Sequence, residues 1–329
     1  MRACVITAPG GPDVLELREV PRPALAPEEV IVRVRASALN RADLLQRAGR
    51  YPAPPGAPAD IPGLEFAGEI ESVGAQVRDW REGDRVFGIV GGGAHADYVA
   101  VPAGSLAPVP FGMPWPIAGA IPEAFITAHD ALVTQGRLIR GDRVLIHAIG
   151  SGVGLAAAQL ARQCGAHVFG TARTADKLVQ ARTHGMDEGV VPMEGARGIA
   201  DALLTWSGGH GADVVLDLVG GAYVPESLRA IALRGRYLLV GLVAGAQATI
   251  DLSRLLRQRV HLMGTVLRAR SAEEKAQVTA AFVRDVLPGL AAGTLSPVID
   301  TVMPLDRIAE AHRRLEENQS TGKIAITVD

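Results

Sequence analysis

The sequence predicts an α/β protein that combines a β-rich domain with a doubly wound, parallel-sheet domain. Short valine-rich runs punctuated by Pro and Gly fill the first third of the chain. After about residue 120, apolar strand-like runs alternate with amphipathic helical segments, and a glycine-rich turn at residues 150–154 precedes the first of these helices. At 329 residues the chain exceeds one compact core of ordinary size, so two domains are expected.

The first third of the chain has the pattern of short β-strands joined by loops. Strand-like runs with period-2 character lie at Val30–Val34, Ile70–Val73, Arg85–Ile89 and Asp97–Val101. The segment Tyr51–Pro62 contains five prolines, which favour a loop over a helix. This part is therefore expected to be β-rich with long connections.

The middle of the chain has the pattern of alternating strands and helices. Its predicted strands are Arg143–Ala148, His167–Thr171, Val190–Val191, Asp213–Leu218, Arg236–Gly241 and Val260–Gly264. The predicted helices lie near Gly152–Cys164, Ala175–His184, Ala196–Trp206 and Val224–Leu233. Strands that are apolar throughout indicate a parallel sheet covered on both faces, and six of them suit a dinucleotide-binding fold.

The tail returns to mixed character, with helices predicted at Ala272–Ala292 and Leu305–Asn318 and strands at Val298–Val302 and Ile324–Val328. The sixth strand of the central series, Val260–Gly264, is expected at a sheet edge. Open edges are usually covered or paired.

Composition and charge exclude several classes of function. The net charge is −2, from 33 basic and 35 acidic residues, so a nucleic-acid partner is not expected. The two cysteines, Cys4 and Cys164, exclude a four-cysteine zinc site within one chain. The N-terminus lacks the apolar run of a signal peptide, which predicts a cytoplasmic protein. The uncharged stretch Val144–Ala161 has glycines clustered near its middle, which favours a strand, turn and helix over a membrane span.

The glycine-rich turn predicts a nucleotide site at Gly150, Ser151, Gly152, Val153 and Gly154. Glycines let the backbone turn tightly and approach a pyrophosphate, and a helix N-terminus offers free N–H groups to phosphates. The spacing is not Gly-x-Gly-x-x-Gly, because Ser151 stands where a glycine is possible. Its hydroxyl either faces the nicotinamide or caps the helix.

The end of the second central strand predicts NADP rather than NAD. An NAD-binding site places Asp or Glu about 20 residues beyond the glycine turn, on the ribose 2′-hydroxyl. This chain instead has Arg173 and Lys177 there, with Thr171 and Thr174 as hydroxyl donors, a set that suits a 2′-phosphate. The alternative is an exposed basic helix start without a ligand.

Several segments resemble the zinc-free quinone oxidoreductases of the medium-chain dehydrogenase/reductase family. They are Asn40–Asp43, Arg47–Pro52, Gly63–Gly68, Ile121–Ala128, Ser151–Gly154 and Gly322–Ile324, in order along essentially the whole chain. The resemblance is nearest to the branch with the tumour-suppressor-inducible NADPH quinone oxidoreductase. It implies a GroES-like catalytic domain over residues 1–121 and 266–329, and a Rossmann NADP-binding domain over residues 122–265. It also implies NADPH in the cleft between them, and a homodimer or dimer of dimers.

Zinc-dependent alcohol dehydrogenases share this architecture and hold their catalytic zinc with Cys, His and Cys. The corresponding residues here are Asn40, Leu64 and Glu123. Leucine cannot ligate a metal and asparagine is a poor zinc ligand, so no metal site is expected. Without a metal, hydride transfer suits a quinone or the β-carbon of an enone, because the resulting charge delocalises onto an oxygen that hydrogen-bond donors can stabilise.

The resemblance also implies individual site residues. Tyr51 and Asn40 are expected beside the nicotinamide and substrate, with Ser151 as a third catalytic candidate. The expected cofactor contacts outside the glycine turn and the Thr171–Lys177 segment are Thr127, Gly241, Leu242, Leu267 and Lys323. Alternatives remain open at three positions: Tyr51 as a loop anchor, Asn40 with Asp43 as a helix cap, and Glu65 in a buried ion pair.

Other functions remain open beside the quinone reductase. An NADPH-dependent enone or enoyl-thioester reductase needs basic residues at the pocket mouth for a large carrier, and Arg268 and Arg270 are the local candidates. A crystallin-like or regulatory protein would bind NADPH without turnover. The expected partner is a small-molecule quinone or enone, with no nucleic acid and no membrane.

Overall fold

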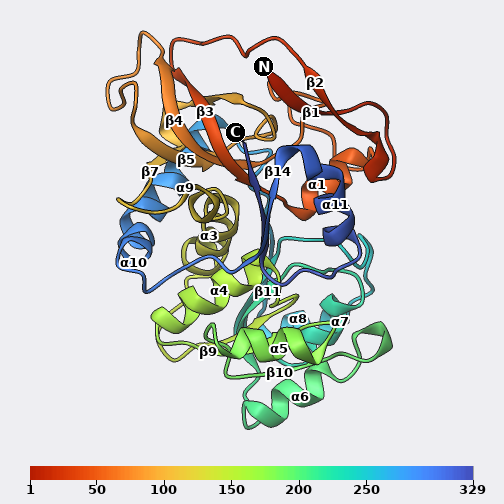
Figure 1. Ribbon diagram of the computed structural model, residues 1–329. Helices are drawn as coiled ribbons and strands as arrows, with labels where there is room; N and C mark the ends of the chain where they lie inside the picture. The colour runs from red at the N-terminus through yellow and green to blue at the C-terminus, as the bar shows by residue number, and fades with distance from the viewer. Residues whose placement is uncertain (329) are drawn as a thin grey trace. The chain divides into compact units, whose positions relative to one another are not determined.

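The computed structural model describes residues 1–328. The chain forms two compact units, one made of Met1–Ile126 and Leu267–Asp329 and the other of Thr127–Val266. In Figure 1 the first unit carries both ends of the chain, and the second contains the green and cyan helices. The first unit is called here the β-rich unit and the second the parallel-sheet unit.

The β-rich unit is built around β3 (Glu29–Ala38), the longest strand. The strand order of its seven-stranded sheet is β14-β15-β3-β4-β5-β7, and β6 also pairs with β3. The other strands are β4 (Glu65–Val73), β5 (Arg85–Ile89), β6 (Tyr98–Pro102), β7 (Leu106–Pro108), β14 (Ile299–Pro304) and β15 (Lys323–Thr327). A separate hairpin pairs β1 (Arg2–Ile6) with β2 (Leu15–Glu19).

The return of the chain end to β3 is important for the site. β15 pairs antiparallel with β3, and Ala325 lies opposite Ala38. The start of β15 therefore lies next to the end of β3, where the helix α1 (Arg41–Arg47) begins. Residues almost 300 positions apart in sequence thus become neighbours within one unit.

The remaining helices of this unit flank the sheet. They are α2 (Trp115–Ala118), α9 (Ala272–Asp285), α10 (Leu287–Ala291) and α11 (Ile308–Glu316), with short 3-10 turns at Pro12–Val14, Ala103–Ser105 and Leu305–Arg307. The prediction of one helix over Ala272–Ala292 was wrong, because the chain breaks at Val286 and restarts as α10 with Pro288 in its first turn. The helix α3 (Pro122–His129) runs across the boundary of the two units.

The parallel-sheet unit contains the six predicted strands. They are β8 (Arg143–Ile146), β9 (His167–Thr171), β10 (Glu188–Val190), β11 (Ala212–Asp217), β12 (Ile231–Leu239) and β13 (His261–Gly264), in the spatial order β10-β9-β8-β11-β12-β13. All neighbouring pairs are parallel. Counted along the chain this is 3-2-1-4-5-6, the order of a dinucleotide-binding sheet. β13 ends the sheet, which confirms the predicted edge position.

The helices of this unit connect successive strands. They are α4 (Gly152–Gln163), α5 (Ala175–Arg182), α6 (Ile199–Trp206), α7 (Tyr223–Leu228) and α8 (Leu252–Gln258), with a π-helix at Asp130–Gln135 and a 3-10 turn at Glu194–Ala196. The predicted helix Val224–Leu233 was wrong at its C-terminal end. Ile231 already pairs with Ala212 and begins β12, because sheet pairing and burial override the local helical pattern.

The uncharged stretch Val144–Ala161 forms part of β8, the turn and most of α4. Within residues 1–328, every helix falls short of the length and apolarity that crossing a bilayer requires.

Gly154 is required by the close packing of α4 on the turn before it. A Cβ at this position would lie 2.6 Å from the carbonyl oxygen of Ala148 and 2.7 Å from the Cα of Ile149. We expect Gly154→Ala to lower the free energy of unfolding by about 1–3 kcal/mol, because backbone must move. Thermal and urea denaturation measure the effect. Gly11→Ala is the control, since no atom lies within 4 Å of its added Cβ, and an equal loss in both variants would contradict this explanation.

Candidate functional site

The glycine-rich turn connects β8 to α4 in the parallel-sheet unit. Ala148 adopts a positive φ of 50°, and the N–H of Ile149 donates to the carbonyl of Thr171 on the neighbouring strand β9. Ser151 is the N-cap of α4, and its Oγ accepts a hydrogen bond of 3.1 Å from the N–H of Gly154. The capping alternative for Ser151 is therefore the one present, and the hydroxyl keeps its own proton to donate.

The start of α4 has the features of an anion site. The first N–H groups of a helix lack intrahelical acceptors, and Ser151 caps only that of Gly154. The N–H groups of Gly152 and Val153 remain available to a phosphate, where the helix dipole adds a partial positive charge. Gly150 faces Lys177, since a Cβ at Gly150 would lie 3.0 Å from the Cβ of that lysine. The predicted cation Lys177 thus lies over the turn.

Arg173 lies in the loop after β9 and is exposed. Burial raises the pKa of Tyr223, and the positive charge of Arg173 opposes this rise. Two predicted cations, Arg173 and Lys177, therefore flank the carboxyl end of β9, and no carboxylate follows Thr171 within the next four residues.

Thr171 does not present its hydroxyl as predicted. The residue is 1% exposed, and its Oγ1 lies 3.0 Å from Nδ1 of the buried His147. Nε2 of His147 lies 2.7 Å from the hydroxyl of Ser227. Burial lowers the pKa of His147 to about 4, so the imidazole is neutral and structural. The hydroxyl of Thr171 is hydrogen-bonded to His147 inside the core, so it does not point toward the predicted phosphate.

Thr127 carries a buried hydroxyl without a partner. Its Oγ1 is inaccessible to solvent and forms no hydrogen bond with any of residues 1–328. An unsatisfied buried hydroxyl costs roughly 1–3 kcal/mol, so such a group in a native protein requires an explanation, and a bound ligand is one. Thr127 was predicted to contact the nicotinamide, and its environment fits that role.

The remaining cofactor candidates differ in environment. Gly241 follows β12 and has no room for a side chain, because a Cβ would lie 2.4 Å from the carbonyl oxygen of Leu218. Leu242 is half exposed. Leu267 is buried at the first position of the returning segment of the β-rich unit.

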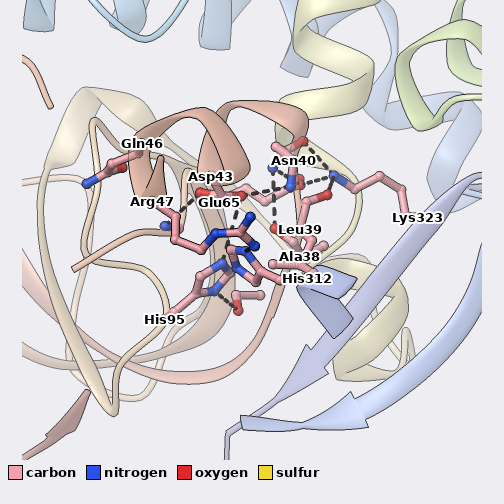
Figure 2. Close-up of polar contacts among 12 residues, drawn as sticks. Ala38, Leu39, Asn40, Asp43, Gln46, Arg47, Glu65, His95, His312 and Lys323 are labelled. Atoms are coloured by element: carbon pink, nitrogen blue, oxygen red, sulfur yellow. Dashed lines mark hydrogen bonds and ion pairs between the residues drawn. The ribbon is translucent and has the colours of Figure 1, made fainter. Parts of the chain in front are cut away.

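The polar site of the β-rich unit begins at Asn40, the N-cap of α1 (Figure 2). The N–H of Asn40 donates to Oδ2 of Asp43 at 2.7 Å, and Oδ1 of Asp43 accepts from the N–H of Gly63 at 2.9 Å. The helix-cap alternative for this pair is therefore confirmed. Burial opposes ionisation of Asp43, but its hydrogen bonds and the charge of His95 lower the pKa of the carboxyl.

Lys323 holds this site together through its ammonium group, and its predicted contact with the cofactor stays a prediction. Its Nζ lies 2.8 Å from the carbonyl oxygen of Leu39, 2.6 Å from Oδ1 of Asn40 and 2.6 Å from Oε1 of Glu65. The ammonium donates two hydrogen bonds, to Leu39 and Asn40, and its charge pairs with the Glu65 carboxylate. Lys323 is only 4% exposed, and Figure 2 shows its side chain reaching toward Asn40. The buried-ion-pair alternative for Glu65 is confirmed by the same contact.

Asn40 is held by its neighbours rather than free to donate to a substrate. Its Nδ2 donates to Oε1 of Glu65 at 2.9 Å and, more weakly, to the carbonyl oxygen of Ala38 at 3.3 Å. Its Oδ1 accepts from Lys323. Both amide protons of Asn40 are donated to protein acceptors, and its predicted place beside the nicotinamide and substrate stays a prediction.

Tyr51 differs from Asn40, because its polar group is not bound by neighbouring side chains. Arg268 lies under its ring, 4.9 Å from the centroid, and donates to the Tyr51 carbonyl at 3.2 Å. The same guanidinium donates to the carbonyl of Gly91 at 2.8 Å and to Oε1 of Gln46 at 2.5 Å. The ring is thereby fixed, while the hydroxyl forms no hydrogen bond with any of residues 1–328 and remains able to bind a ligand.

Glu123 belongs to this site, although the sequence indicated only that it replaces a metal ligand. It lies in the first turn of α3, and its N–H donates to Oε2 of Glu65 at 2.9 Å. Burial and the charge of Glu65 raise the pKa of Glu123 to about 8, which Lys323 and Lys275 partly oppose. The sequence places this residue in one of the segments that resemble the quinone oxidoreductases, but it does not indicate the environment of the carboxyl, which comes from distant segments.

Residues 1–328 contain no cluster of three or more His, Cys, Asp or Glu side chains arranged to hold a metal ion. Leu64 is 1% exposed. Of the three positions that correspond to zinc ligands, one is therefore an apolar core residue.

The ion pair between Lys323 and Glu65 predicts a specific stability pattern. We expect Lys323→Met to lower the free energy of unfolding by about 3–5 kcal/mol, because it leaves the buried Glu65 carboxylate without its cation. Adding Glu65→Gln should recover part of this loss. Urea denaturation of the single and double variants measures the coupling, and Arg18→Met in an exposed pair with Glu16 is the control. A double variant that loses the sum of both single effects would contradict the pairing.

Comparisons with known proteins agree with this geometry. Residues 26–111 match the family model described as alcohol dehydrogenase GroES-like domain, and residues 152–283 match the one described as zinc-binding dehydrogenase. Quinone oxidoreductase of Lama guanicoe is 31% identical over 330 residues, covering 99% of this chain and 97% of that protein.

Two solved structures show the same fold over the whole chain. A mycobacterial protein in complex with NADPH has a TM-score of 0.88 at 28% identity and covers 100% of both chains. The ER cyclopropanase of the curacin A biosynthetic pathway has a TM-score of 0.88 at 25% identity and covers 100% of this chain and 99% of that one. The predicted combination of a GroES-like and a Rossmann domain is thus confirmed. The chain belongs to the medium-chain dehydrogenase/reductase family and is an oxidoreductase of its quinone and enoyl reductase branch.

Proposed function

We propose that the protein is an NADPH-dependent quinone oxidoreductase that works without zinc. The observation that carries the proposal is the donor set of the β-rich unit. Tyr51 presents an unpartnered hydroxyl on a fixed ring, Glu123 contributes a carboxyl with a raised pKa, and a buried leucine stands at a zinc-ligand position. Such a set suits an acceptor that needs hydrogen bonds to a developing oxyanion rather than a Lewis acid.

The residues of the parallel-sheet unit fit a nicotinamide dinucleotide. Gly152 and Val153 supply N–H groups for the pyrophosphate, and Gly154 lets α4 pack closely on the turn that precedes it. The unpartnered Thr127 hydroxyl, the Ser151 proton and the backbone around Gly241 and Leu242 are the proposed contacts of the nicotinamide half. When bound, the cofactor supplies a hydride from C4 of its nicotinamide.

The preference for NADPH over NADH rests on the end of β9. Arg173 and Lys177 place two cations beside the glycine turn, where a ribose 2′-phosphate would meet them. A carboxylate that would bind the 2′-hydroxyl of NADH is not present in this loop. The relative solved with NADPH supports the same choice.

In the mechanism the protein orients the acceptor and stabilises its charge. The Tyr51 hydroxyl donates to the acceptor oxygen as negative charge develops there. Arg268 holds the Tyr51 ring in place, and the Lys323–Glu65 pair fixes the adjoining ends of β3 and α3. A quinone reduced in this way becomes a hydroquinone after it gains one proton.

An enone or enoyl-thioester reductase is the second candidate, and likeness to the ER cyclopropanase of the curacin A pathway favours it. Arg268, a predicted contact for a large carrier, is 4% exposed and donates to three protein acceptors. This environment argues for small acceptors and against a carrier-bound substrate. The protein is further expected to be cytoplasmic and to form a homodimer, or a dimer of dimers, through the edge strand β13.

The proposal is tested by following oxidation of NADPH and NADH with an ortho-quinone, a short enone and an aldehyde, each with and without a chelator. We expect chelator-resistant turnover of the quinone with NADPH. Aldehyde turnover that a chelator abolishes would refute the metal-free mechanism. NADPH binding without turnover of any acceptor would favour the non-catalytic alternative, and faster turnover of the enone would favour the second candidate.

The cofactor choice is tested by the double variant Arg173→Ala, Lys177→Ala. We expect KM for NADPH to rise about 10- to 100-fold, because charge-assisted hydrogen bonds to the 2′-phosphate are lost, while KM for NADH stays the same. Arg257→Ala, an exposed cation on α8 of the same unit, serves as the control. Equal changes for both nucleotides would contradict recognition of the 2′-phosphate by this loop.

A further inference from the structure

A buried carboxyl group, that of Asp217, ends β11 in the parallel-sheet unit. The residue is inaccessible to solvent. Its Oδ2 accepts a hydrogen bond of 2.6 Å from the hydroxyl of Tyr237, and its Oδ1 accepts from the N–H groups of Val219 at 2.7 Å and Gly220 at 2.9 Å. A carboxyl group is costly to bury even when it is hydrogen-bonded, so its place in the core requires a reason beyond packing.

The position of Asp217 in the sheet lies next to the glycine turn. β11 and β8 are neighbours, and the strand order of this sheet reverses between them. In open α/β sheets, ligands bind outside the carboxyl ends of the strands at such a point. Leu216 lies opposite Ile146 in the register, so Asp217 is level with the residues that lead from β8 into the turn.

The backbone after Asp217 is joined to the backbone after β12. The carbonyl of Asp217 accepts from the N–H groups of Val240 at 2.8 Å and Gly241 at 3.1 Å. The carbonyl of Val219 accepts from the N–H of Ala244 at 2.8 Å. The loops at residues 218–222 and 240–245 therefore support each other, and a group that fixes the first loop also fixes the second.

Tyr237 anchors the carboxyl to the middle of the sheet. It lies on β12 opposite Val215, with its side chain buried in the core. Its hydroxyl reaches past the end of β11 to Oδ2 of Asp217, while Oδ1 of the same carboxyl binds the first loop. One carboxyl group thus connects a central strand to both loops.

We propose that Asp217 is a positioning residue for the cofactor, which acts through the loop at residues 240–245 to set the orientation of the nicotinamide ring. This inference rests on the proposed function, in which the backbone around Gly241 and Leu242 contacts the nicotinamide half. The proposed phosphate contacts lie elsewhere, at the glycine turn and the end of β9. Loss of the carboxyl should therefore slow hydride transfer while the affinity for NADPH stays the same.

The experiment compares Asp217→Asn and Tyr237→Phe, alone and combined, with Asp213→Asn. Asparagine keeps one oxygen for the loop N–H groups and loses the acceptor of Tyr237. Asp213 is the matched control on the same strand, because its carboxyl accepts from the N–H of Arg143 at the opposite, amino end of the sheet.

Turnover of the quinone with saturating NADPH is the first readout. We expect kcat to fall about 10- to 100-fold in Asp217→Asn, because hydride transfer depends steeply on the placement of the ring. The Kd for NADPH should not change. The isotope effect on kcat with NADPH deuterated at C4 should rise, whereas a simple loss of folded protein would leave it unaltered. Tyr237→Phe should have a smaller effect, and the double variant should resemble Asp217→Asn, since both changes break the same hydrogen bond.

The second readout does not require turnover. Hydrogen exchange at the amides of Val219, Gly220 and Ala244 should be faster in Asp217→Asn and Tyr237→Phe, and unchanged in Asp213→Asn. The fluorescence of bound NADPH, which reports the surroundings of the nicotinamide, should also differ from that of the unsubstituted protein in the first two variants only.

The outcomes separate this inference from the proposed function. A folded Asp217→Asn with unchanged kcat, isotope effect and NADPH fluorescence would overturn the positioning role and leave the quinone reductase intact, as would a weaker Kd with unchanged kcat. If Asp217→Asn does not fold, Tyr237→Phe decides the question by the same measurements. Failure of the unsubstituted protein to reduce any acceptor would refute the proposed function, and amide exchange with NADPH fluorescence would then decide the role of Asp217. Failure to bind NADPH would refute both.

Discussion

The buried contact between Lys323 and Glu65 is the interaction on which the polar site of the β-rich unit depends. Removing both charges from water carries a desolvation cost of several kcal/mol per ion, so the pair persists only because its remaining hydrogen-bonding groups are satisfied. The ammonium donates hydrogen bonds to Leu39 and Asn40 and pairs with Glu65, and the carboxylate also accepts hydrogen bonds from Asn40 and the backbone N–H of Glu123. One ion pair thereby joins the end of β3, the middle strand β4, the start of α3 and the last strand β15.

A second polar network supports the other side of α1 (Figure 2). Asp43 caps the helix, Nε2 of His95 lies 3.9 Å from Oδ2 of Asp43, and Nδ1 of His95 lies 2.8 Å from the hydroxyl of Ser37. Arg47 at the end of the same helix pairs with Glu316 and is 1% exposed. Both ends of α1 are therefore fixed by buried polar contacts, so Asn40 at its N-cap has little freedom to move. Nε2 of His95 forms no hydrogen bond with any of residues 1–328, so this network is only partly satisfied.

The two units build their candidate sites from different groups. In the parallel-sheet unit, backbone N–H groups and glycines create an anion site that needs few side chains, and Ser151 completes the helix cap at its edge. In the β-rich unit, side chains carry the chemistry, and cations neutralise the acids around them. Tyr51 is held in place while its hydroxyl stays available to a ligand, because Arg268 contacts the ring and the carbonyl but not the hydroxyl.

Features of short range were determined by the sequence alone. The six strands of the parallel sheet and the glycine turn opening α4 follow from local patterns, and the cap formed by Asn40 and Asp43 was one of the alternatives that these residues allowed. Element ends were less predictable: α7 stops before Ile231, and the α9–α10 segment breaks before Pro288, because pairing and packing override local preference.

Only the tertiary structure decided which polar side chains remain free for a ligand. Lys323 and Asn40 are 283 positions apart, and no periodicity links them, so their contact could not be predicted from spacing. The same reason explains why the Thr171 hydroxyl is used by His147, why the Thr127 hydroxyl is left unpaired, and why Glu123 is an acid with a raised pKa. The sequence gives the residue types. Burial and the charges of distant segments determine whether each polar group is hydrogen-bonded within the protein or stays available to a ligand.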